Sequence, residues 1–115
     1  MAGVPHPLPD DLADLIARRF RAISDPLRIK LIDRLRDGER SVNELADVLG
    51  AGQQNVSKHL SVLADAGIVA RRKDGNHVYY RIADRGVIDL CTQVCGSLER
   101  QTHALALVVG GAAGI

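Results

Sequence analysis

Helix start and stop signals divide the first 67 residues into short segments. Asp25-Pro26 predicts a helix start, because the carboxylate accepts from free first-turn amides and proline has no amide to satisfy there. Ser41 and Glu44 have the spacing of a capping box, which predicts another start. Between these signals, apolar residues recur at steps of three and four, as in helices with one buried face. We therefore expect four helices that begin near Asp10, Pro26, Val42 and Gln53.

The sequence after Gly67 changes from helical spacing to strand-forming residues. Residues 68–73 and 78–82 are rich in β-branched and aromatic side chains, and Asp74-Gly75 lies between them. An Asp-Gly pair favours the positive backbone angles of a two-residue turn, so we expect a β-hairpin. Asp84 then predicts the start of a last helix, whose apolar residues continue at helical spacing toward Leu105.

The 115 residues, of which 46% are hydrophobic and 25% charged, have the size and composition of one globular domain. We expect a flexible proline-rich arm over residues 1–9, one domain over residues 10–106 and a flexible tail over residues 107–115. No apolar run reaches the ~20 residues that a membrane span needs. Cys91 and Cys95 are too close in sequence to close a useful disulfide loop. These features predict a cytoplasmic protein with no membrane partner.

Five strings between Ala22 and Ile82 resemble, in order and spacing, those of the ArsR/SmtB family of bacterial repressors. They are SDPLR at 24–28, SVNELA at 41–46, NVSKHL at 55–60, LADAG at 63–67 and GNHVYY at 75–80. The resemblance implies a mainly helical α+β fold, a winged helix-turn-helix in which four helices precede two strands and a last helix. It also implies a homodimeric transcriptional repressor that binds double-stranded DNA at a palindromic operator.

The first and last predicted helices carry more apolar side chains than a small core with a hairpin can cover. Such a surplus favours burial between two subunits, in agreement with the dimer that the resemblance implies. The side chains concerned are Leu12, Leu15, Ile16, Phe20, Val87, Leu90, Val94 and Leu98.

The helix predicted from Gln53 is the second of the helix-turn-helix, and its first turns carry short polar groups that can read base edges in the major groove. The alternative is that these groups only cap and solvate the helix. The candidate DNA-reading residues are Gln53, Gln54, Asn55, Ser57, Lys58 and His59.

The predicted hairpin concentrates positive charge that the whole chain lacks. The chain has a net charge of +1, whereas Arg71, Arg72, Lys73 and Arg81 oppose only Asp74. We expect this wing to contact phosphates, with Arg71, Arg72, Lys73 and His77 as candidates, and to make binding depend on salt. The alternative is that these charges are only solvated.

Family members sense metals or other inducers, and the residues of two familiar family sites are largely missing. The box that holds two cysteines at the third helix reads Ser41-Val42-Asn43 here. In the site on the last helix, Asp84 is retained, but the remaining ligand positions hold Gly86, Ser97 and Arg100. The resemblance therefore gives no support to a zinc site of the familiar kind.

Cys91 and Cys95 lie one turn apart on the last predicted helix, and Glu99 and His103 continue the same step. These four side chains could hold a thiophilic metal or metalloid ion, which would be the only cofactor. The two thiols could instead respond to oxidants. A third reading makes Cys91 a core residue, because buried cysteine behaves as a small apolar side chain.

No catalytic motif is present in the sequence, which has no glycine-rich phosphate loop, HExxH pair or nucleophile elbow. We therefore expect no enzyme activity. A competing function is that of a co-regulator or antirepressor that keeps the fold and acts through a protein partner.

Overall fold

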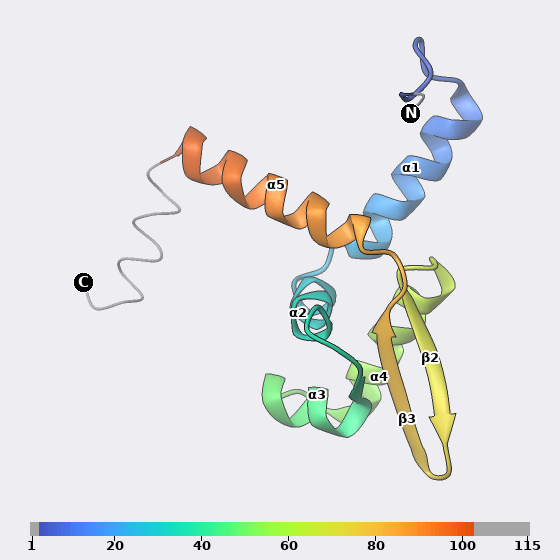
Figure 1. Ribbon diagram of the computed structural model, residues 1–115, viewed down its shortest axis with the longest axis vertical. Coiled ribbons are helices and arrows are strands. Elements are labelled where there is room, and N and C mark those ends of the chain that lie inside the picture. The colour runs from blue at the N-terminus through green and yellow to red at the C-terminus, as the bar shows by residue number, and fades with distance from the viewer. Residues whose placement is uncertain (1–2, 103–115) are drawn as a thin grey trace. The chain divides into compact units, whose positions relative to one another are not determined.

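The computed structural model describes residues 3–102 and contains the predicted order of elements, with one additional short strand. The described chain forms two compact units, of which the first ends at Ala83 and the second begins at Asp84. The elements of the first unit are α1 (Asp10–Ile23), α2 (Pro26–Leu35), β1 (Arg40–Ser41), α3 (Val42–Leu49), α4 (Gln53–Asp65), β2 (Val69–Asp74) and β3 (His77–Ile82). The second unit contains α5 (Gly86–Gln101). This is a winged helix-turn-helix of mainly helical α+β class, as predicted (Figure 1).

The predicted helix starts of α2 and α3 are confirmed by their caps. Asp25 Oδ2 accepts hydrogen bonds from the amides of Leu27 at 2.9 Å and Arg28 at 3.2 Å. Ser41 Oγ accepts from the Glu44 amide at 3.1 Å, and Glu44 Oε1 accepts from the Ser41 amide at 3.0 Å. These bonds stabilise the ionised carboxylates, so the pKa values of Asp25 and Glu44 lie below their ordinary values. Both helices therefore begin where local sequence sets them.

The β-hairpin is confirmed, but its turn lies one residue later than the Asp74-Gly75 pair predicts. Asp74 pairs with His77 across the hairpin, which leaves Gly75 and Asn76 as the loop. Gly75 has a φ of 61°, and none of the described residues other than glycine has a positive φ. A single left-handed glycine at the first loop position suits this turn, so Asp74 remains in the ladder.

The short strand β1 was not predicted from the sequence. Its two residues pair with β3 in antiparallel register, Arg40 opposite Tyr80 and Ser41 opposite Tyr79, which gives a three-stranded sheet in the order β1, β3, β2. A strand of two residues is too short to show the alternation of apolar and polar side chains that predicts a strand. The strand fixes the start of α3 to the hairpin.

The core of the first unit lies between α2, α3, α4 and the base of the hairpin. Each of these elements contributes the apolar face that its spacing predicts, and most of the buried residues have almost no exposed surface. The buried apolar residues of the first unit are Ala22, Ile23, Leu31, Ile32, Leu35, Leu45, Ala46, Val56, Leu60, Leu63, Ile68, Val69 and Tyr80. Because α4 buries one face in this core, its opposite face lies toward solvent.

Helix α5 begins one residue later than a capping Asp84 predicts. Arg85 occupies the N-cap position, while Asp84 Oδ1 accepts from the Gly86 amide at 2.9 Å. The helix ends at Gln101 within the described chain, and the predicted extension to Leu105 lies outside the described residues. None of the helices over residues 3–102 is long and apolar enough to cross a membrane.

Candidate nucleic-acid interface

The first turns of α4 present an exposed polar surface. Gln53, Gln54, Asn55 and Lys58 are exposed, and Ser57 is partly exposed. Val56, Leu60 and Leu63 on the other side of the helix are completely buried. The buried face therefore fixes the helix while the amide side chains point outward. The structure brings five of the six predicted DNA-reading residues to one accessible surface.

The N-terminus of α4 lacks the groups that usually neutralise a helix start. Gly52 stands at the N-cap, without a side-chain hydrogen bond to the first turn, and that turn has no acidic residue. The first amides of a helix carry partial positive charge and bind anions. The start of α4 is thus suited to lie beside a phosphate while its side chains reach the bases.

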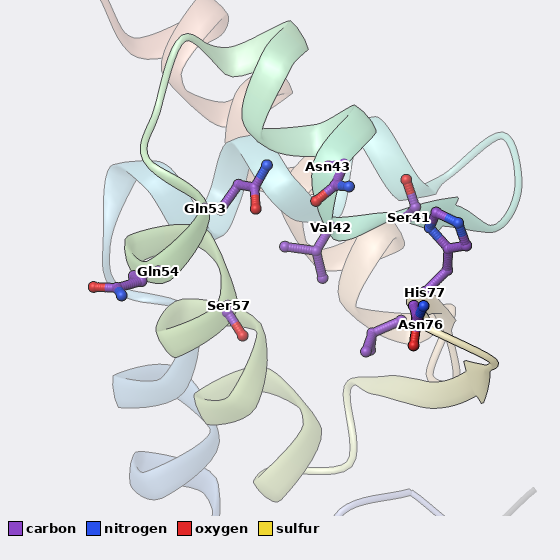
Figure 2. A pocket seen from close by; sticks show the side chains of 9 residues that line it. Ser41, Val42, Asn43, Gln53, Gln54, Ser57, Asn76 and His77 are labelled. Atoms are coloured by element: carbon purple, nitrogen blue, oxygen red, sulfur yellow. The ribbon is translucent and has the colours of Figure 1, made fainter.

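A hollow of about 270 Å³, with polar and apolar groups in its lining, lies between the starts of α3 and α4 and the turn of the hairpin. Figure 2 shows Gln53 directed toward Asn43 and Val42. The residues that line the hollow are Ser41, Val42, Asn43, Gln53, Gln54, Ser57, Asn76, His77 and Val78. None of them is a carboxylate or an ammonium group, so the hollow offers hydrogen-bonding groups without a fixed charge.

Asn43 and Asn76 join this surface, although the sequence interpretation did not select them. Asn43 follows the capping Ser41 directly, and Asn76 is the second loop residue of the hairpin. Each is a polar residue next to a helix cap or a hairpin turn, so the sequence alone suggests only a solvent-exposed role. The structure brings the two residues to the same hollow. His77 lines the same hollow.

His59 differs from the other predicted α4 residues in its surroundings. It is partly buried, and its Nδ1 lies 3.0 Å from Arg28 Nη1 and 3.9 Å from Asp25 Oδ2. Arg28 also donates to the Arg21 carbonyl at 3.4 Å. The structure therefore gives His59 a place in a polar contact between α4 and the start of α2. A role in supporting α4 fits this geometry better than direct base contact.

The wing cations also divide into two kinds. Arg71 and Lys73 are exposed and form no ion pair with other residues of the part of the chain that the structure describes. Arg72 is paired with Glu39 and lies over the ring of Tyr79. Arg71 and Lys73 of β2 are thus available to phosphates, and Arg81 of β3 is exposed as well.

The two cysteines of α5 have different environments. Cys91 is partly buried and Cys95 is exposed, and neither forms a disulfide. Cys95 Sγ lies 3.8 Å from Glu99 Oε1, one turn further along the helix. His103 lies outside the described residues. Over residues 3–102 no group of three or more histidine, cysteine, aspartate or glutamate side chains is arranged to hold a metal ion.

Comparison with known proteins identifies the same fold. A family model for a helix-turn-helix domain matches residues 23–72. The chain is 41% identical over 86 residues to the transcriptional regulator KmtR of Mycobacterium tuberculosis, covering 75% of this chain and 66% of that protein. It is 40% identical over 80 residues to the repressor SmtB of the same species, covering 70% of this chain and 59% of that protein. The chain therefore spans only about three fifths to two thirds of the length of these relatives.

A solved structure extends the match to most of the chain. It is the solution structure of a homodimeric winged helix-turn-helix DNA-binding domain from Mycobacterium bovis, described as a possible ArsR-family transcriptional regulator. The TM-score is 0.72 at 32% sequence identity, and the match covers 88% of this chain and 93% of that domain.

Proposed function

Because this chain belongs to the ArsR/SmtB family of winged helix-turn-helix regulators, we propose that it is a transcriptional repressor that binds double-stranded DNA. The observation that carries the proposal is the polar surface formed by the first turns of α4 and the neighbouring hollow. Amide and hydroxyl groups at a helix start suit base edges in the major groove, which presents a distinct pattern for each base pair. The cytoplasm is the compartment in which such a protein reaches its operator.

In this proposal, α4 lies in the major groove and the wing contacts the backbone. Gln53, Gln54, Asn55 and Ser57 read bases, while the free amides at the start of α4 and Lys58 hold a phosphate. Arg71 and Lys73 contact phosphates from the wing, and His77 stands at the rim of the hollow. Because the chain has a net charge of only +1, affinity depends on these local groups.

We also propose that the repressor is a two-fold dimer. Leu15 and Phe20 on α1 are 57% and 48% exposed, and Val94 and Leu98 on α5 are 50% and 45% exposed. Large apolar side chains in such numbers favour burial against a second copy. A two-fold dimer presents two copies of α4, so its operator is a palindrome with half-sites one or more DNA turns apart.

Lys58→Ala tests DNA binding directly. We expect weaker binding to every duplex, and a slope of log affinity against log salt that is reduced by about 0.9, because one phosphate contact is lost. The measurement is fluorescence anisotropy with a duplex that the protein selects from a random-sequence library, over a series of salt concentrations. Lys30→Ala is the matched control, because Lys30 is an exposed lysine on α2.

The same titration separates the repressor from the competing co-regulator function. A co-regulator that acts through a protein partner selects no duplex, and Lys58→Ala changes nothing. The near-neutral charge of the chain and the missing residues of the familiar family metal sites are the features that favour this alternative. Selection of a defined palindrome would exclude it.

We further propose that Cys91 and Cys95 make DNA affinity respond to a thiophilic ion. Side chains four residues apart on a helix have Cβ atoms about 5 to 6 Å apart, whereas a disulfide needs about 3.5 to 4.5 Å. An ion bound by two thiolates at about 2.3 Å each joins sulfur atoms up to about 4.6 Å apart without bending the helix. This geometry supports an ion over a disulfide, with Glu99 beside Cys95 as a weak additional donor.

Mercuric ion is the probe for this part of the proposal. One equivalent per reduced protomer should lower operator affinity by about 5- to 150-fold, the usual range of allosteric coupling. Cys91→Ser and Cys95→Ser should each abolish the response, whereas Ser97→Ala on the same helix should retain it. A response that persists in the double serine variant would contradict the assignment, and a response to peroxide alone would favour oxidation of the thiols.

A further inference from the structure

The guanidinium group of Arg72 is engaged on all of its nitrogen atoms and on one face. Its Nε and Nη2 donate to the two carboxylate oxygens of Glu39 at 3.1 and 2.7 Å. Its Nη1 lies 3.6 Å from Asp74 Oδ2, and its Cζ lies 4.6 Å from the centroid of the Tyr79 ring. A guanidinium group that donates from two nitrogens to one carboxylate forms a bidentate ion pair, which lysine cannot form. The two donors of this bidentate pair are thus committed to Glu39.

Glu39 joins Arg72 from a distant part of the sequence. It lies in the connection between α2 and β1, next to Arg40, which pairs with Tyr80 of β3. Arg40 Nε donates to the Arg34 carbonyl at 3.1 Å, which holds the same connection on α2. The ion pair thus links the β2–β3 hairpin to the segment that leads into α3.

The ionisation of both partners agrees with a pair that is formed in the folded protein. The hydrogen bond from Arg72 lowers the pKa of Glu39 below its ordinary value, and the bond to Glu39 raises the pKa of Arg72. Half of the Arg72 side chain is still exposed, so the pair contributes modestly to stability. Its effect is to orient the hairpin more than to hold the fold together.

Arg71 and Lys73 provide the contrast within the same strand. Successive side chains of a strand point to opposite faces, so Arg72 and its two neighbours lie on different faces of the hairpin. Arg72 shares its face with Tyr79, its cross-strand partner, whereas Arg71 is opposite Tyr80. The strand therefore separates one internally paired arginine from two cations that are open to solvent.

We propose that Arg72 is a positioning residue for DNA binding and makes no phosphate contact itself. Its pair with Glu39 holds the hairpin so that the wing turn stays at the rim of the hollow between α3 and α4. This inference rests on the proposed DNA-binding function, and it reassigns a residue that the charge pattern placed among the phosphate contacts. It also gives Glu39, an acidic residue near the interface, a role that supports affinity.

The test is a double-mutant cycle of Arg72→Ala and Glu39→Gln, with Arg71→Ala as the control. Each variant of the pair should lower operator affinity by about two- to fivefold, the scale of a partly exposed ion pair, and the double variant should lose no more than either one. Arg72→Ala should leave the salt slope unchanged, whereas Arg71→Ala should reduce it by about 0.9. Hydrogen exchange at the amides of residues 78–81 should accelerate in both pair variants without any DNA present.

The outcomes separate this inference from the proposed function. Tighter binding by Glu39→Gln, or a salt slope reduced by about 0.9 in Arg72→Ala, would show that Arg72 contacts phosphate and would overturn the positioning role. Unchanged hydrogen exchange in the hairpin would overturn it as well. If the wild type binds no duplex, the repressor proposal itself fails, whatever the exchange rates are.

Discussion

Leu60→Ala should lower the free energy of unfolding by about 2 to 5 kcal/mol, because it removes a completely buried side chain and leaves a cavity. Leu60 lies on the inner face of α4, so the lost packing is that of the helix that carries the candidate DNA-reading residues. Such a loss is a large part of the total stability of a small domain, which is about 5 to 15 kcal/mol. Urea denaturation followed by circular dichroism, at one fixed protein concentration, measures it.

Val48→Ala is the matched control for this prediction. Val48 is an apolar residue of the neighbouring helix α3, but its side chain is 53% exposed. Its replacement should change the unfolding free energy by no more than about 0.5 kcal/mol. Equal losses in the two variants would show that α4 does not pack against the core as the structure has it.

The sequence predicts the helices and the hairpin well because their signals are local. The Asp25 cap, the Ser41 and Glu44 capping box and the glycine stops act within four residues of one another. The apolar spacing then decides which face of each helix is buried. β1 escapes prediction because its two residues are a strand only through their partners in β3.

His59 and Arg72 were both selected as candidate DNA contacts, and the structure pairs each of them with a side chain from a distant part of the sequence. His59 and Arg72 are polar residues in polar stretches, so their sequence surroundings suggest a solvent-exposed role. Their partners, Arg28 and Glu39, lie 31 and 33 residues away along the chain. Only the packing of α2 against α4, and of the hairpin against the α2–β1 connection, brings these pairs together. Periodicity and local charge carry no information on such contacts.

The hollow was not predicted from the sequence, although several of its lining residues were selected as candidates. Gln53, Gln54 and Ser57 were selected as a helix surface, and His77 as part of a wing. Their convergence with Asn43 and Asn76 depends on the turn that follows α3 and on the register of the hairpin. The one-residue shift of the hairpin turn places Asn76 in the loop, beside these groups.

Gln54→Ala should lower affinity for the selected operator by about 5- to 150-fold, because a glutamine amide that bonds one adenine edge is worth about 1 to 3 kcal/mol. Gln54 is exposed at the start of α4 (Figure 2). Affinity for a scrambled duplex of equal length should stay unchanged, since phosphate contacts are intact. Anisotropy titrations of both duplexes at one salt concentration measure the two effects side by side.

Gln101→Ala provides the control, because Gln101 is an exposed glutamine at the end of α5. It should bind both duplexes as the wild type does. If Gln54→Ala weakens the two duplexes equally, the side chain contributes to backbone contact and not to base reading. If it weakens neither, the specificity must come from the hollow, where Gln53 and Asn43 face each other from the starts of two helices, and from the sequence-dependent shape of the DNA.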